Sequence, residues 1–390
     1  MFLLYIKYIL ILFHSFFINF IFLQYVPKIH YKDNKKLFVY DDVRIHNWPP
    51  VIGYYVDNLL KKERVEEALN LIQQKTCFKF KEYKVIVPGR KGLNFLKNFK
   101  CDYVSFERDF RKYYENNVYL SPFCQDKIGA IQQMTMKVIG FYDIHNRPDR
   151  DNYIDVIYSN IEKKYLKYFD KIYPFVPLAE TAFDFGSALH YNVDIYSNKY
   201  KPIIVSKIDY YYNMLGQQKE LSFNDYKLIN TYYCSDNCIN ETNFCLNSGY
   251  LNPHNCTQCI CPPNFIGERC EEIEKSEDEE CGDIHLWADD VEKQLIILRD
   301  YICNYYIKSK PNTKIKIILE EIDTVEYKPC NSDVGFQIKY IKDKGSTGLC
   351  LCGKYNNITL ISEDNTVFIQ YVGWTFNDKV VVKYQEISEV

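Results

Sequence analysis

Cysteine and histidine are the residue types in this chain with the most chemical potential. The 390 residues include 15 cysteines and seven histidines, and no two histidines lie four residues apart. Two histidines at that spacing share one helix face and can hold one metal ion. Gly186-Ser187-Ala188 lacks the G-x-S-x-G spacing of a serine nucleophile. The residues therefore favour disulfide chemistry in an oxidising compartment, and the odd count leaves at least one thiol unpaired.

Six of the cysteines form a dense group near the middle of the chain. They are Cys238, Cys245, Cys256, Cys259, Cys261 and Cys270. So short a segment cannot bury enough apolar surface by itself, so bridges must hold it together. A zinc knuckle is the alternative, but it wants fewer cysteines with histidines among them, and only His254 is near. The closing CICPPNFIGERC (259–270) resembles an EGF-like domain. This resemblance implies the pairs Cys238–Cys256, Cys245–Cys259 and Cys261–Cys270.

Composition and the N-terminal segment indicate the class of protein and its compartment. The chain is 47% hydrophobic and 25% charged with a net charge of −3, which argues against a disordered chain and against a basic nucleic-acid binder. Tyr8 to Leu23 is apolar behind Lys7, so residues 1–24 are predicted to be a secretory signal peptide; an uncleaved signal anchor is the alternative. No later stretch is apolar and long enough to cross a bilayer.

The elements that must position any site follow from periodicity. Residues 61–74 and 126–141 have the apolar spacing of helices, and residues 54–56 are rich in strand formers. An acidic stretch over 272–280 predicts a solvated linker. Beyond it, regularly spaced β-type runs suggest an antiparallel sandwich. These runs are residues 314–319, 334–341, 366–372 and 379–384.

Five collinear blocks in the first half resemble astacin metalloproteases. The blocks are WPPVIGYYVD (48–57), KTCFKF (75–80), YDIHNRPDRDNY (142–153), FDFGSALHY (183–191) and LSFNDYKLINTYYC (221–234). The resemblance implies an α+β zincin-like (metzincin) domain over 48–234. It also implies the bridges Cys77–Cys234 and Cys101–Cys124.

The zinc motif of that family, HExxHxxGxxH, is degenerate here. Aligned on Gly140, the three His positions hold Gln133, Lys137 and Asp143, and the Glu position holds Met134. The acid that follows the third His is replaced by Ile144, the Met of the turn by Leu189, and only Tyr191 remains. A lysine repels zinc and a methionine cannot accept a proton, so we predict neither a bound cofactor nor zinc hydrolysis.

Substitute ligands are the alternative. Asp143, His145, His190 and Tyr191 could meet in the old cleft, but we favour ordinary polar positions for the two histidines. Met134 could fill the volume of the lost ion and water. Lys137 could extend toward the cleft opening, or it could pair with Asp143 across the former metal position.

Residues 281–388 resemble an all-β CUB sandwich. The resemblance implies Cys281–Cys303 and a second pair beginning at Cys330. Either Cys350 or Cys352 could pair with Cys330, and we predict Cys330–Cys350. The cysteine left unpaired could form an intermolecular disulfide. Asp333 fits one position of the calcium site found in some CUB domains, but no acid convincingly fills the last position. Sequons at Asn240, Asn255 and Asn357 predict glycosylation.

These observations predict a multidomain secreted protein. The expected order is a signal peptide (1–24), a short pro or linker segment (25–47), an astacin-like domain (48–234), an EGF-like domain (235–271), an acidic linker (272–280) and a CUB domain (281–388). We expect a catalytically inactive homologue that binds extracellular proteins or peptides, with no nucleic acid and no membrane span after signal removal. The alternative is an active zinc endopeptidase with non-standard ligands; a product of relaxed selection is a third possibility.

Overall fold

The structure is a computed structural model that describes residues 48–104, 115–172, 181–197 and 201–388. The predicted signal peptide (1–24) and the segment 25–47 lie outside these residues. Among the helices of the described ranges, none has the length and apolarity needed to cross a membrane.

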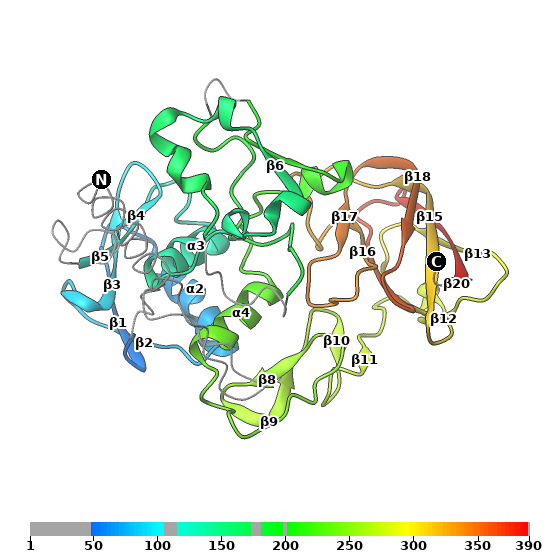
Figure 1. The fold of residues 1–390 in the computed structure, drawn as a ribbon, viewed down its shortest axis with the longest axis horizontal. Coiled ribbons are helices and arrows are strands. Elements are labelled where there is room, and N and C mark those ends of the chain that lie inside the picture. The colour runs from blue at the N-terminus through cyan, green and yellow to red at the C-terminus, as the bar shows by residue number, and fades with distance from the viewer. Residues whose placement is uncertain (1–47, 105–114, 173–180, 198–200, 389–390) are drawn as a thin grey trace, which may run out of the picture. The chain divides into compact units, whose positions relative to one another are not determined.

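The first part of the chain, which we call the N-terminal subdomain, packs helices against a five-stranded sheet of order β2-β1-β3-β5-β4 (Figure 1). The pairs β1–β2, β1–β3 and β3–β5 are parallel, and β4 is antiparallel to β5. Two helices, close to those predicted, bury their apolar faces in the core of this subdomain. The elements are β1 (Val51–Val56), α2 (Lys62–Lys75), β2 (Lys79–Glu82), β3 (Gly89–Lys97), β4 (Asp102–Val104), β5 (Glu115–Leu120) and α3 (Ile128–Ile139).

The described residues between 144 and 234 include five short 3-10 helices and one two-stranded sheet, and this part of the chain ends in helix α4. Ser222 and Asp225 form a capping box at the start of α4, and this box satisfies the first free N–H groups of the helix. The Cys77–Cys234 bridge joins the end of α4 to the residues after α2. The elements are η1 (Ile144–Asn146), η2 (Arg150–Asn152), β6 (Ile154–Val156), η3 (Tyr158–Asn160), η4 (Lys163–Phe169), β7 (Ile204–Ser206), η6 (Asp209–Met214) and α4 (Phe223–Tyr233).

A cysteine-rich module follows over 235–271. Two small hairpins, the second of which extends to Ile273, and the bridges Cys238–Cys256, Cys245–Cys259 and Cys261–Cys270 form it. Its last hairpin packs Phe265 against Phe368 of the following β region, with ring centroids 5.5 Å apart. The strands are β8 (Tyr250–Asn252), β9 (Asn255–Ile260), β10 (Phe265–Ile266) and β11 (Glu272–Ile273).

The C-terminal sandwich consists of two sheets, of order β12-β14-β19-β16-β17 and β13-β20-β15-β18. All pairs are antiparallel, as predicted, except β12–β14, which is parallel. Its apolar core continues into the chain around η6. The elements are η7 (Glu279–Cys281), β12 (His285–Trp287), β13 (Lys293–Leu298), β14 (Ile302–Lys308), β15 (Thr313–Asp323), β16 (Gly335–Lys339), β17 (Leu349–Leu351), β18 (Lys354–Ile361), β19 (Thr366–Val372) and β20 (Lys379–Ser388).

The last bridge differs from the predicted one. The structure contains Cys101–Cys124 and Cys281–Cys303, but it joins Cys330 to Cys352 and leaves Cys350 as a buried free thiol, so Cys330–Cys350 was wrong. Strand register explains the difference. Cys350 lies opposite Gln337 inside the β16–β17 pair, whereas Cys352 lies beyond the end of β17, near the residues that follow Cys330.

Candidate functional site

Helix α3 supplies the floor of the site. Gln133 and Lys137 lie one turn apart on it and therefore face the same way. The helix ends at Gly140, which adopts a left-handed conformation (φ 111°) and donates its N–H to the carbonyl of Met136. A glycine tolerates this φ without strain. The turn that follows brings Asp143 back over the helix, as the third metal ligand of the motif would require.

The side chain of Asp143, at the third His position, contacts the side chains at the other two. Lys137 Nζ lies 3.0 Å from Asp143 Oδ2, and the two side chains are only 3% and 8% exposed. Lys137 Nζ also donates to Tyr191 Oη at 3.0 Å, and Gln133 Nε2 donates to Asp143 Oδ1 at 3.4 Å. The structure thus forms the Lys137–Asp143 ion pair that was one of the two alternatives for Lys137.

Burial dominates the electrostatics of this cluster. It raises the pKa of Asp143, and the neighbouring Lys137 ammonium opposes that shift. Burial also raises the pKa of Tyr191 well above its usual value, so this phenol stays protonated. The Lys137 Nζ lies 4.0 Å from the centroid of the Tyr191 ring, which adds a cation–π contact.

The residues at this position do not fit a zinc ion. Zinc prefers thiolates, neutral imidazoles and carboxylates, and here one carboxylate accompanies an amide, a phenol and an ammonium. The Lys137 ammonium itself neutralises the carboxylate of Asp143. Within the described residues, no three His, Cys, Asp or Glu side chains are grouped so that they could hold a metal ion. Met134, at the Glu position, is partly buried and packs on the core of the N-terminal subdomain.

His145 and His190 lie beside this cluster and are buried, which differs from the ordinary polar positions predicted for them. Their ring centroids are 6.1 Å apart, and the His145 ring centroid lies 4.3 Å from that of Tyr191, with the two ring planes tilted by 37°. Burial lowers the pKa of His190 to about 4 and that of His145 well below its usual value, so both rings are neutral at pH 7. One nitrogen of each ring contacts a backbone carbonyl, of Tyr168 and Tyr191 respectively.

The remaining ring nitrogens, Nδ1 of His145 and Nε2 of His190, have no hydrogen-bond partner within the described structure. The four substitute ligands are therefore only partly brought together. The Tyr191 ring lies against His145, and the Tyr191 hydroxyl accepts a hydrogen bond from Lys137. The Asp143 carboxylate is ion-paired with Lys137.

Other predicted positions lie elsewhere in the structure. The sequon residues Asn240, Asn255 and Asn357 are all exposed, so glycosylation there remains a prediction compatible with their position. Asp333 forms an ion pair with Lys219 at 2.6 Å. Cys350 is fully buried and burial raises the pKa of its thiol.

Sequence reasoning missed a cavity with a mixed polar and apolar lining, where three parts of the chain meet. It includes Lys339, whose side chain is buried although strand alternation alone makes it a surface candidate. No motif marks this residue. The sequence feature that could have indicated its burial is its place near the end of the apolar run 334–341, which the structure buries almost completely.

Comparisons with known proteins agree with the astacin resemblance. The model of the Astacin peptidase family matches residues 42–234. The chain is 27% identical over 340 residues to zinc metalloproteinase nas-34 of Caenorhabditis elegans, covering 84% of this chain and 53% of the relative. It is 28% identical over 332 residues to nas-37 of the same organism, covering 80% and 40%.

This chain thus spans about half the length of the curated relatives it matches. Among solved structures, the hatching enzyme HCE-1 of the medaka Oryzias latipes matches with a TM-score of 0.39 and 22% identity, covering 47% of this chain and 88% of that one. Through residues 42–234, this chain therefore belongs to the astacin family of peptidases.

Proposed function

We propose that this protein is a secreted astacin-family member that does not hydrolyse peptide bonds and acts by binding extracellular proteins or peptides. One observation carries the first half of the proposal. The positions that would hold zinc instead form a buried ion pair, Lys137–Asp143, closed by the hydroxyl of Tyr191.

The chemistry of zinc hydrolysis explains why this observation matters. A zinc endopeptidase needs a metal-bound water and a general base that takes its proton. Met134 stands at the position of the base and carries no basic atom that could do this. The ammonium of Lys137 would repel a second cation placed against Asp143. We therefore assign no bound cofactor to this site and route no catalytic step through it.

Metal content and proteolysis of the purified full chain test this proposal. The protein is incubated with excess zinc, desalted and analysed by plasma mass spectrometry, and fluorescent casein is offered with and without o-phenanthroline. We expect substoichiometric zinc and no cleavage that the chelator suppresses. Stoichiometric zinc together with chelator-sensitive cleavage would overturn the proposal.

A matched control restores the family motif in the same chain. The variant Gln133→His, Met134→Glu, Lys137→His and Asp143→His changes only the positions discussed above. We expect it to retain zinc through desalting, because Gly140 and the turn after α3 still present the third position. Zinc in this variant and none in the parent assigns the difference to these four side chains.

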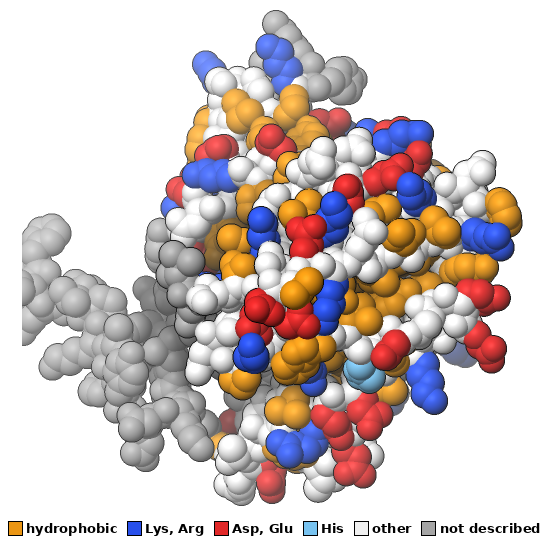
Figure 2. All heavy atoms as spheres, turned by 90° about the vertical axis from the view of Figure 1, so that its right-hand side faces the viewer, with side chains coloured by type: hydrophobic (Ala, Val, Ile, Leu, Met, Phe, Trp, Pro, Cys, Tyr) orange, Lys and Arg blue, Asp and Glu red, His pale blue; other side chains and the backbone are white. Residues whose placement is uncertain are grey.

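Several features support an extracellular role. Seven disulfides lie in the described residues, as expected of a chain that folds in an oxidising compartment. We assign the cysteine-rich module to the EGF-like class and the C-terminal sandwich to the CUB class. On the face in Figure 2, hydrophobic side chains lie among charges of both signs. Strands β13 and β18 of the sandwich expose Ile296, Leu298 and Ile361 by 52%, 44% and 53%.

Affinity capture tests the binding half of the proposal. The full chain is immobilised and exposed to secreted proteins, with the Ile296→Lys and Ile361→Lys double variant as the control. Reproducible capture that this variant loses supports binding through the sandwich face. Equal capture by both proteins places binding elsewhere on the molecule.

An active zinc endopeptidase with substitute ligands is the second candidate. The observation in its favour is the pair of neutral, buried imidazoles of His145 and His190, each with one nitrogen unpaired within the described residues. Variants His145→Gln and His190→Gln distinguish the candidates. They abolish any zinc binding or cleavage that depends on these rings.

A further inference from the structure

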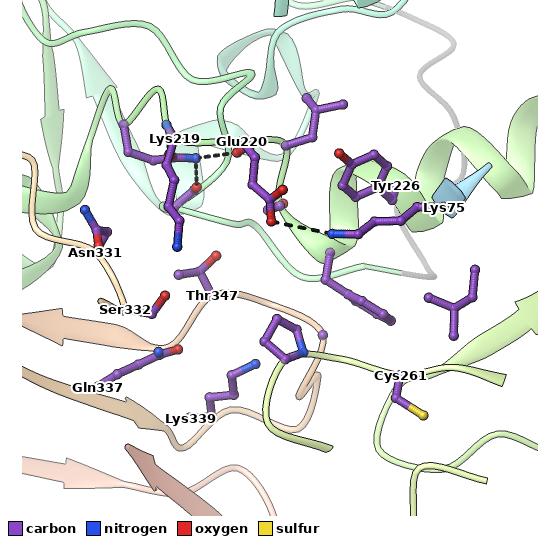
Figure 3. A pocket seen from close by; sticks show the side chains of 18 of the residues that line it. Lys75, Lys219, Glu220, Tyr226, Cys261, Asn331, Ser332, Gln337, Lys339 and Thr347 are labelled. Carbon is purple, nitrogen blue, oxygen red and sulfur yellow. Dashed lines mark hydrogen bonds and ion pairs between the residues drawn. The ribbon is translucent and has the colours of Figure 1, made fainter. Parts of the chain in front are cut away.

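A cavity of about 260 Å³ lies where the N-terminal half, the cysteine-rich module and the C-terminal sandwich meet. Figure 3 shows Lys339 and Gln337 of β16 on one side of this space, with Lys219 and Glu220 across from them. Phe223, at the start of α4, and Pro263 of the cysteine-rich module contribute apolar walls. None of the residues considered above as metal ligands or catalytic groups lines this cavity.

Lys339 gives the cavity its chemical character. This residue is only 2% exposed, and its Nζ donates to the backbone carbonyl of Lys344 at 2.8 Å. An ammonium has three protons to donate, and no carboxylate of the described residues lies within ion-pair distance of this one. Asp184 and Asp343 attract it only from farther away. Burial lowers the pKa of Lys339 to about 8, so most of the molecules carry the charge at pH 7.

The other charged groups of the lining already have partners. Lys75 pairs with Glu220 at 3.5 Å, and Lys219 pairs with Asp333 at 2.6 Å. Each pair is neutral as a whole, which leaves Lys339 as the uncompensated charge of the described lining. A buried charge without an ionic partner is costly, and a ligand carboxylate would relieve that cost.

We propose that this cavity binds a small organic carboxylate. The carboxylate contacts the ammonium of Lys339, and the hydroxyls of Ser332 and Thr347 line the same space. The apolar body of the ligand lies against Phe223 and Pro263. Because the lining comes from three parts of the chain, the bound acid stabilises their arrangement. This inference is independent of the proposed loss of proteolysis.

Binding of benzoate and benzamide to the full chain tests the charge requirement. The two probes share an aromatic ring and differ in the carboxylate, so isothermal titration calorimetry isolates the contribution of the charge. We expect benzoate to bind at least tenfold more tightly than benzamide. Undetectable benzoate binding, or equal affinity for both probes, would overturn the proposal. Inorganic phosphate is the third probe; if it binds as tightly as benzoate, the site is a simple anion site and the proposal fails.

Variants of Lys339 test the location. Lys339→Met removes the charge at similar length, and we expect it to weaken benzoate binding at least tenfold without changing benzamide binding. Lys339→Gln keeps a donor for the carbonyl of Lys344 and serves if the first variant does not fold. The matched control is Lys354→Met, in the same sandwich, whose side chain is 78% exposed. Benzoate binding that survives both changes at Lys339, or that falls equally in the control, would refute the site.

Discussion

The variant Lys137→Met removes one partner of the buried ion pair at the former metal position. The methionine side chain is one heavy atom shorter than that of lysine and lacks the ammonium, so the change tests the charge more than the packing. Asp143 is then left 8% exposed, with the Gln133 amide still donating to it. We expect a large loss in the free energy of unfolding, because the buried carboxylate of Asp143 no longer has an ionic partner.

The geometry sets the size of the effect. Two unit charges 3.0 Å apart attract by about 5.5 kcal/mol at an effective dielectric constant of about 20. Breaking a buried pair typically costs about 3–5 kcal/mol, because one charge remains desolvated. We expect a loss in this range at about pH 8.

The loss should shrink in acid. Without Lys137, burial alone acts on the Asp143 carboxyl and raises its folded pKa further above the unfolded value. Between the two pKa values the folded state holds a proton that the unfolded state has released. Stability therefore falls as pH rises through this window, by at most about 1.4 kcal/mol per pH unit. The variant should lose less at about pH 5 than at about pH 8.

Urea unfolding followed by the emission of Trp48 measures this effect. Its indole N–H donates to the carbonyl of Ile139 at 3.0 Å, so it reports on the end of α3. Trp287 and Trp374 are 49% and 54% exposed and are replaced by phenylalanine in every protein compared.

The control is Lys61→Met, which breaks the exposed Lys61–Asp126 pair at 2.6 Å. It should cost no more than about 1 kcal/mol. A loss below about 1 kcal/mol for Lys137→Met, or a loss that does not change with pH, would refute the reasoning.

Three further predictions concern buried groups and bridges. Burial lowers the pKa of His190 to about 4, so the free energy of unfolding should fall by about 3 kcal/mol as pH falls from about 6.5 to about 4. In urea unfolding, the free energy of unfolding of His190→Gln should depend less on pH over this acid range. Cys350 should resist iodoacetamide until urea unfolds the chain, and the protein should run as a monomer on non-reducing gels; rapid labelling in the folded state contradicts its burial. The double variant Cys77→Ser, Cys234→Ser opens a bridge between residues 157 apart and should lose about 5 kcal/mol, seen as a lower thermal midpoint; an unchanged midpoint argues against the chain-entropy account.

Local patterns determined much of the architecture in advance. The apolar spacing over 61–74 and 126–141 predicted α2 and α3 to within a few residues, because helical amphipathicity is written in neighbours three and four apart. The β-type runs likewise became β15, β16, β19 and β20. Residue identity also decided the absence of the family ligands, since Lys137 and Met134 occupy their positions whatever the fold does.

Contacts between distant segments needed the tertiary structure. Cys330 could pair with Cys350 or Cys352 by spacing, and only the register of β17 on β16 selects the second. The burial of His145 and His190 depends on packing against η4 and on the turn before Tyr191, which no local pattern reports.

The former metal position and the cavity around Lys339 also differ in how much of each the sequence determined and how much only the fold decided. The sequence by itself determined that no histidine stands where zinc would be held, since this is a matter of residue type at motif positions. Only the tertiary structure decided what replaced the metal, because Lys137 and Tyr191 are 54 residues apart and meet through the fold. The cavity around Lys339 depends wholly on the tertiary structure. Its walls come from segments that touch only when the N-terminal half, the cysteine-rich module and the sandwich pack together, and no pattern within one segment encodes that meeting.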